Sequence, residues 1–274
     1  MPLPLRWVYI PRATNYRDLK MPISVIDTKQ ASHTKDLYYE DRVNLTAAFR
    51  MTARLNMDEG VANHFSYAVS EDGSQFLVNP FGRHFSSIRA SELLLLDANG
   101  EATAKADPTA WAIHGAMHRN APHARCVMHV HSKYATVLAS LADSGLPPID
   151  QNTMRYFNRV AVDDGYDGMG LGNEAERLSS KLDENRILLL GNHGVIAVGN
   201  SIARAFDELF YFERACRNYI TALMTRQPLR VASDAVAEKT ARQWEEYSDS
   251  FGACDVYLRE IREILDREEP DYKL

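Results

Sequence analysis

Few cysteines and no long hydrophobic run are present in the sequence, and each shortage argues against a class of protein. The cysteines, Cys126, Cys216 and Cys254, are far apart and form no CxxC motif. We therefore expect no disulfide framework. We expect a location in a reducing cytoplasm. The longest apolar runs, Leu93–Leu96 and Ile187–Leu190, are much shorter than the ~20 residues of a membrane span. The N-terminal residues contain no secretory-type apolar segment, so we expect no membrane association.

Positive charge is also scarce and dispersed. The formal net charge is −6 over 274 residues, and no stripe of lysine and arginine is evident, which argues against a nucleic-acid partner. The glycines of the GYDGMGLGNE segment do not form a GxGxxG motif after a strand. Hydrophobic residues at 45% and charged residues at 25% are ordinary for a globular protein. A small-molecule substrate is the expected partner.

Hydrophobic spacing predicts alternating helices and strands. Residues 1–38 are expected to form an N-terminal arm, residues 39–230 an α/β domain, and residues 231–274 a charged helical tail packed on that domain without a core pattern of its own. The predicted helices cover residues 40–56, 107–124, 132–143, 173–185 and 201–225, and the predicted strands cover 64–70, 75–80, 91–100, 126–131, 186–192 and 194–200. Residues 150–164 are expected to mix loop and strand.

Several helix starts carry capping residues. Asp107 is expected to cap a helix that has Pro108 at its first position, where proline is favoured. Asn173 and Ser201 are expected to cap two later helices. These signals support the predicted boundaries.

Three histidines follow apolar strands. His129 and His131 lie two residues apart, so on a strand both side chains point to one face and Val130 points to the other. His193 lies between Gly191 and Gly194, where glycines permit a tight bend and close backbone approach. Each histidine alone could be an ordinary hydrogen-bonded residue. Together they predict a site where imidazoles bind one divalent ion at about 2.0–2.1 Å with coordination positions left open.

The segments HVHSKYATVLAS and LLLGNHGVIAVGNSIARAFDELFYFERAC resemble the class II aldolase/adducin family. The resemblance runs from about Val43 to about Thr225, through NHFSYAVS, FLVNPFGRHF and PTAWAIHGAMHRNAPHARCVMHVH. It implies a three-layer α/β/α fold with a central, mostly antiparallel mixed sheet. It also implies a divalent metal held by His129, His131 and His193, and a homotetramer with the active site near a subunit interface. Zinc is the expected ion, with iron, manganese or cobalt as alternatives.

The family's sugar-phosphate aldolases carry an acidic residue about nineteen positions before the first metal histidine. Here that position is Ala110. Asp107 lies near the helix start and would need a different geometry to substitute. His114 is four residues on, on the same helical face, and is either a substitute for the acid or a structural histidine behind the sheet. Tyr134 is a further catalytic candidate, with core packing as the alternative.

The phosphate-binding segments of those aldolases are also depleted. Where a Gly-Asn pair is usual the chain has Ala62–Asn63, and a Thr/Ser-Gly turn is replaced by Asn79–Pro80–Phe81–Gly82. Pro108–Thr109 replaces a Ser-Ser pair. Asn63 and Gly82 are the remaining candidates for substrate binding, and Arg83 and His84 could pair with an anionic substrate. A carboxylated substrate is thus at least as well supported as a sugar phosphate.

Other polar side chains have simpler explanations. Glu208, Tyr211 and Glu213 are expected on a solvated or subunit-facing surface of the long helix that follows His193. Asp150, Gln151 and Asn152 are expected in an ordinary loop.

Three functions are consistent with these features. The first is a metal-dependent lyase that stabilises an enolate of a small hydroxy-carbonyl or carboxylated substrate. The second is an Fe(II)-dependent oxygenase or decarboxylase that uses the same histidines. The third is a non-catalytic assembly protein like adducin, although adducin heads lack intact catalytic histidines and this chain has no basic tail.

Overall fold

The computed structural model describes residues 37–100, 103, 105–168 and 174–274. Most of the expected arm, residues 1–36, and the expected cap Asn173 lie outside the described residues. Residues Tyr38–Leu274 form one compact unit. Its strands are β1 (His64–Ala68), β2 (Gln75–Val78), β3 (Leu94–Asp97), β4 (Cys126–Val130), β5 (Val160–Asp163), β6 (Ile187–Leu190) and β7 (Gly194–Gly199).

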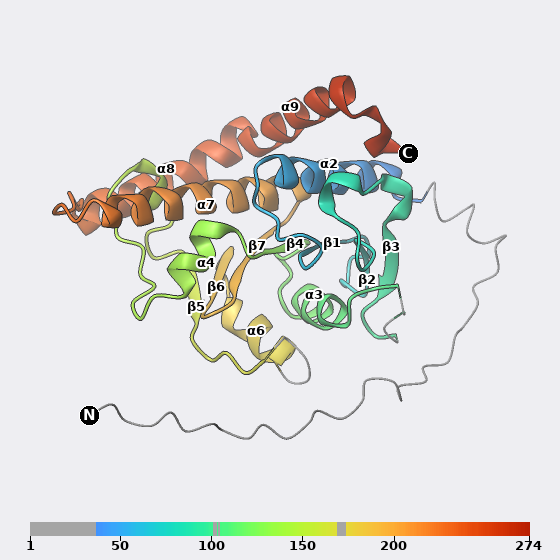
Figure 1. Ribbon diagram of the computed structural model, residues 1–274, viewed down its shortest axis with the longest axis horizontal. Coiled ribbons are helices and arrows are strands. Elements are labelled where there is room, and N and C mark those ends of the chain that lie inside the picture. Colours follow the sequence, from blue (N-terminus) through green and yellow to red (C-terminus); the bar gives the residue numbers. More distant parts are fainter. Residues whose placement is uncertain (1–36, 101–102, 104, 169–173) are drawn as a thin grey trace, which may run out of the picture. The chain divides into compact units, whose positions relative to one another are not determined.

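The helices of this unit connect or follow the strands (Figure 1). They are α2 (Tyr39–Arg54), α3 (Pro108–Asn120), α4 (Lys133–Ala139), α5 (Gln151–Arg155), α6 (Glu174–Leu182), α7 (Ile202–Met224), α8 (Asp234–Phe251) and α9 (Ala253–Glu268), with short 3-10 turns at η2 (Phe85–Ser87), η3 (Ala90–Glu92) and η4 (Pro270–Lys273). None of the helices in the described ranges is long and apolar enough to cross a membrane.

The sheet has seven strands in the order β3-β2-β1-β4-β7-β6-β5. All neighbouring strands are antiparallel except β5 and β6, which are parallel. The expected α/β fold with a mostly antiparallel mixed sheet is therefore confirmed. In the β1–β2 turn, Gly73 has φ 72°, and a Cβ there would lie 2.2 Å from the carbonyl oxygen of His118, so the turn packs tightly against α3.

Alternation along the strands produces three layers. On β4, Cys126, Met128 and Val130 belong to the core cluster shared with α2, α4, α7 and α9. Val127 belongs to the cluster shared with α3 and α6 on the opposite face. Figure 1 shows α2, α7 and α9 on one side of the sheet and α3 and α6 on the other. Side chains on β4 thus point alternately into the two helical layers.

The predicted caps at Asp107 and Ser201 are present. Asp107 accepts hydrogen bonds from the backbone of Thr109 and Ala110, with Pro108 in the first turn. Ser201 accepts from the backbone N–H of Arg204. The sequence did not reveal α5, where Asp150 and Thr153 form a capping box at the start of a five-residue helix, so the loop expected at Asp150–Asn152 is wrong.

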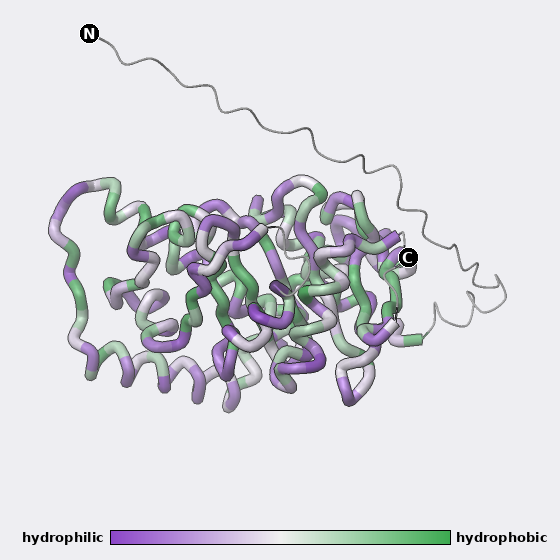
Figure 2. Tube along the Cα trace, turned by 90° about the horizontal axis from the view of Figure 1, so that it is seen from below, coloured by the Kyte–Doolittle hydropathy of each residue, from purple (hydrophilic) through white to green (hydrophobic). Residues whose placement is uncertain are grey.

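The C-terminal helices contribute to the main core, so the expectation that the tail lacks a core pattern is wrong. Cys254, Leu258, Ile261 and Leu265 recur at helical spacing along α9 and are all buried in the cluster that contains α2 and α7. Figure 2 shows the outer helices alternating between hydrophobic and hydrophilic residues along their length. The charged residues between the buried positions obscured this narrow apolar stripe.

Glu213 is buried and fixes the start of α4, which corrects its expected placement on a solvated surface. Its carboxylate accepts hydrogen bonds from Ser132 Oγ and from the backbone N–H groups of Tyr134 and Ala135, at 2.7–2.9 Å. The side chain of Ser132 itself makes no capping bond. A residue of α7 therefore holds the segment directly after His131 in place.

Replacing Leu265 by alanine should lower the free energy of unfolding by about 2–5 kcal/mol, because Leu265 is fully buried and leaves a cavity. The matched control is Leu223→Ala, since Leu223 is 39% exposed on α7; it should change stability far less. Urea unfolding followed by circular dichroism measures both. Equal, small effects would show that α9 is not part of the cooperative core.

Candidate metal centre

His129, His131 and His193 converge at one end of the central strands. His129 is near the end of β4, His131 is the first residue past it, and His193 lies in the turn between β6 and β7. One nitrogen from each ring lies within 4.8 Å of the others. His129 is buried, and the other two are partly exposed. The structure thus brings together the three predicted histidines, two of them partly exposed to solvent.

Hydrogen bonds at Nδ1 orient two of these rings. His129 Nδ1 lies 3.1 Å from the carbonyl oxygen of Val195, and His131 Nδ1 contacts the carboxylate of Glu59. Because both partners can only accept, each Nδ1 carries a proton, which leaves Nε2 as the nitrogen with a lone pair when the ring is neutral. The two Nε2 atoms are 3.0 Å apart. Two lone pairs that face each other at this distance fit a shared cation.

Burial keeps the rings in the form that binds metal. Desolvation is the main cause that lowers the pKa of His129 well below its usual value, and neighbouring histidines lower it further. Desolvation likewise lowers the pKa of His193 to about 4. Both imidazoles are therefore neutral near pH 7, with a lone pair available to an ion.

The turn that carries His193 is anchored on three sides. Asn192 takes the left-handed conformation at φ 58°. Gly191 N donates to the carbonyl of Asp163 at 2.7 Å, and Asn192 N donates to that of Ala139 at 3.0 Å. A Cβ on Gly194 would lie 2.6 Å from the Val130 carbonyl oxygen and 2.9 Å from the His131 ring. The close approach expected for these glycines is thus present, and it sets His193 against His131.

Ala110, at the position of the missing acid, lies in an apolar environment. It is buried in the cluster formed by Phe76 and neighbouring residues of β2 and β3. Asp107 is occupied as the cap of α3, where it accepts from Thr109. His114 is fully buried, with Nε2 2.7 Å from His64 Nδ1.

The two candidates for substrate binding differ in their surroundings. Asn63 is buried, and its Oδ1 accepts from the backbone N–H of Glu59 at 2.7 Å. Its Nδ2 is a buried donor that has no hydrogen-bond partner within the described ranges. Gly82 has φ 74°, beside Phe81, which is 62% exposed. Asn63 therefore has an unused donor among the described residues, whereas Gly82 has no side chain to offer.

Other candidates are engaged elsewhere. Arg83 pairs with Glu92, and His84 pairs with Asp58. Tyr134 is half-buried on α4 and packs against the main core cluster. These contacts account for each side chain without a ligand.

Sequence reasoning missed Glu59, His64, Ser66 and His118. Glu59 lies in an irregular segment 72 positions before His131, so no local pattern joins the two. His64 and Ser66 have the two-residue spacing of one strand face, and His114 and His118 have the four-residue spacing of one helix face. That double spacing was a usable signal.

The model of the Class II Aldolase and Adducin N-terminal domain matches residues 43–220 of this chain. A provisionally named aldolase class 2 protein of Caulobacter vibrioides is 32% identical over 242 residues, which cover 85% of this chain and 92% of the relative. The decarboxylase NovR of Streptomyces niveus is 28% identical, with coverages of 76% and 80%. A 4-hydroxy-3-prenylphenylpyruvate oxygenase/4-hydroxy-3-prenylbenzoate synthase of Streptomyces roseochromogenus is 30% identical, with coverages of 62% and 65%.

Solved structures show the same architecture. An aldolase II superfamily protein from Pseudomonas syringae superposes with a TM-score of 0.79 at 28% identity, covering 87% of this chain and 97% of that one. An L-fuculose 1-phosphate aldolase from Glaciozyma antarctica superposes with a TM-score of 0.72 at 22% identity, covering 90% and 96%. The second likeness concerns the fold alone.

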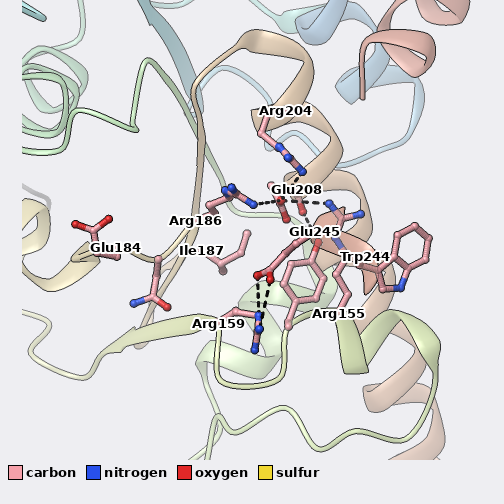
Figure 3. Close-up of a pocket in the computed structure, with 11 residues that line it drawn as sticks. Arg155, Arg159, Glu184, Arg186, Ile187, Arg204, Glu208, Trp244 and Glu245 are labelled. Atoms are coloured by element: carbon pink, nitrogen blue, oxygen red, sulfur yellow. Dashed lines mark hydrogen bonds and ion pairs between the residues drawn. The ribbon is translucent and has the colours of Figure 1, made fainter. Parts of the chain in front are cut away.

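A hollow of about 160 Å³ has none of the three histidines in its lining and is rich in arginine (Figure 3). Its lining includes Arg155, Arg159, Arg186, Arg204, Glu208, Trp244 and Glu245. Neighbouring carboxylates form ion pairs with several of these arginines. Arg155 pairs with Asp207 and Glu208, Arg159 with Glu238 and Glu245, and Arg204 with Asp249. The side chains around the hollow therefore form an ion-pair network that joins α5, α7 and α8. It also shows that the surface placement expected for Glu208 is wrong, because Glu208 is buried.

Replacing Arg155 by methionine should cost about 3–5 kcal/mol of stability, because it leaves the buried carboxylates of Asp207 and Glu208 without their main partner. Arg259→Met is the control, since Arg259 is exposed on α9, and it should stay within about 0.5 kcal/mol of the parent. Denaturant unfolding at pH 7 distinguishes the two variants. A cost at Arg155 no greater than at Arg259 would contradict the network's structural role.

Proposed function

Because the chain belongs to the class II aldolase and adducin family, we propose that it is a divalent-metal-dependent lyase with His129, His131 and His193 as the metal ligands. The main support is the pair of Nε2 lone pairs 3.0 Å apart, with His193 completing the set within 4.8 Å. Three protein nitrogens with positions left open are typical of a catalytic rather than a structural site. Zinc suits these ligands best, and iron, manganese and cobalt are alternatives.

The proposed substrate is a small hydroxy-carbonyl or carboxylated compound. A bound ion would polarise its carbonyl group and stabilise the enolate that forms when the C–C bond breaks. Asn63 Nδ2, a buried donor without a partner in the described ranges, is our candidate to donate a hydrogen bond to a substrate oxygen. Ala110 excludes the proton-transfer role that an acid would have there, and the phosphate-binding segments are depleted. The depleted segments favour a substrate without a phosphate group.

A homotetramer in the cytoplasm is the proposed setting of this activity. The three cysteines are free and buried, which agrees with a reducing compartment. Size-exclusion chromatography with light scattering measures the assembly directly.

Measurement of metal content and affinity tests the ligand assignment. The purified protein should bind one equivalent of Zn²⁺, and His193→Ala should weaken binding at least 100-fold. Glu59→Gln should weaken it by about 10–100-fold, because Glu59 orients His131. His123→Ala is the matched control, since His123 is partly exposed and bonds only to the Asn185 carbonyl within the described residues.

Activity should follow the metal. Retro-aldol cleavage in a panel of hydroxy-ketones and hydroxy-acids should disappear with chelator and return with added ion. Equal affinity of the parent and His193→Ala would refute the ligand set. Failure of the metal-loaded protein to cleave any compound would refute the lyase.

An Fe(II)-dependent oxygenase or decarboxylase is the second candidate. It is favoured by relatives named as a decarboxylase and as a phenylpyruvate oxygenase, and by three neutral imidazoles that leave positions open. Anaerobic loading with iron, followed by oxygen-uptake measurement with aromatic 2-oxo acids, separates the candidates. Uptake coupled to loss of CO₂ would favour the oxygenase, and no uptake with any of them would count against it.

A further inference from the structure

Four buried polar side chains lead from the metal centre into the α3 layer. His64 and Ser66 lie on β1, and His114 and His118 lie on α3. His64 Nδ1 is 2.7 Å from His114 Nε2, and His114 Nδ1 is 2.5 Å from Ser66 Oγ. Ser66 Oγ is also 2.7 Å from His118 Nε2. The four groups form one continuous chain of hydrogen bonds.

The far end of this chain is fixed by the backbone. His118 Nδ1 lies 2.7 Å from the carbonyl oxygen of Ala124. A carbonyl oxygen can only accept, so His118 Nδ1 must carry a proton. No other arrangement satisfies this contact.

Burial disfavours a positive charge on every ring in the chain. All four side chains are at most 5% exposed. Desolvation lowers the pKa of His118 to about 4, and it lowers that of His114 well below its usual value. A neutral imidazole has one N–H donor and one acceptor, so one fixed proton determines the next.

The direction of each bond follows from the Ala124 carbonyl. With Nδ1 protonated, His118 Nε2 is an acceptor, and the single hydroxyl hydrogen of Ser66 points to it. Ser66 Oγ must then accept from His114 Nδ1, which leaves His114 Nε2 as an acceptor. His64 Nδ1 must therefore donate to His114.

We propose that this chain holds His64 as the Nδ1–H tautomer, so that its Nε2 is a bare hydrogen-bond acceptor at the metal centre. His64 lies directly opposite His129 in the β1–β4 register, and their ring centroids are 4.9 Å apart. Within the described ranges, the side-chain hydrogen bond of His64 is the one between its Nδ1 and His114. Free neutral histidine prefers the opposite tautomer, so the protein imposes this one.

The acceptor assigns His64 a positioning role that rests on the proposed function. A ligand bound at the three histidines would find an acceptor in His64 and a donor in Asn63 Nδ2. That pair matches a hydroxyl hydrogen and a carbonyl or carboxylate oxygen on one molecule. The site should therefore prefer α-hydroxy-carbonyl or α-hydroxy-acid ligands over their O-methyl analogues, which lack the donor hydrogen.

Solid-state NMR of protein labelled with ¹⁵N-histidine tests the tautomers directly, without metal or substrate. His64, His114 and His118 should each show a pyrrole-type Nδ1 and a pyridine-type Nε2, assigned from single His→Gln variants. A pyridine-type Nδ1 at His64 in the full-length parent would overturn the inference. The tautomers are read from the spectrum of the parent protein, and the variants serve only to assign its signals.

A second experiment interrupts the chain of hydrogen bonds at Ser66. Ser66→Ala removes the hydroxyl that links His114 and His118, so a fraction of His64 should change to the Nε2–H tautomer. Ser66→Thr should retain the parental spectrum. An unchanged His64 in Ser66→Ala would contradict control by the chain. Zn²⁺ affinity, measured in parallel, reports on the proposed function separately: expected tautomers without metal binding would reject the lyase and leave this inference standing.

Discussion

The pairing register of β1, β4 and β7 is the constraint on which the rest of the structure depends. It sets His64 opposite His129 and His129 opposite Ile196. Since side chains alternate between the two faces of a strand, a slip of one residue would turn His129 into the α2–α7 core and expose Met128 to the α3 layer. The same slip would move the buried residues Met128 and Val130 out of the main core, which disfavours it. The same apolar pattern that stabilises the fold thus fixes which imidazoles meet.

The sequence predicted the parts of the site that depend on local patterns. The two-residue spacing of His129 and His131, the glycines around His193 and the strand–turn–strand pattern are all short-range features, and the structure brings those three side chains together. The fold class followed from periodicity and resemblance. The caps at Asp107 and Ser201 were equally local.

Local sequence patterns could not predict the contacts between distant segments. Glu59 reaches His131 across 72 positions, and Glu213 caps α4 from 78–81 positions away. An acidic residue on a long helix is usually solvated, so only the packing of α7 against α4 reveals its role. The α9 stripe was hidden by charged residues between its buried positions. In each case tertiary packing decided what a locally ambiguous residue does.

The absence of an acid at Ala110 changes the electrostatics of the centre as well as its proton transfer. Three neutral imidazoles would not compensate the charge of a bound divalent ion, and the carboxylate of Glu59 lies on the Nδ1 side of His131. A carboxylate at position 110 would reduce that positive charge, but it would have to be buried beside Phe76 at a large desolvation cost. The neutral chain ending at His64 supplies a polar group without adding charge. A centre built in this way should favour anionic ligands, which is the physical reason to expect a carboxylated substrate.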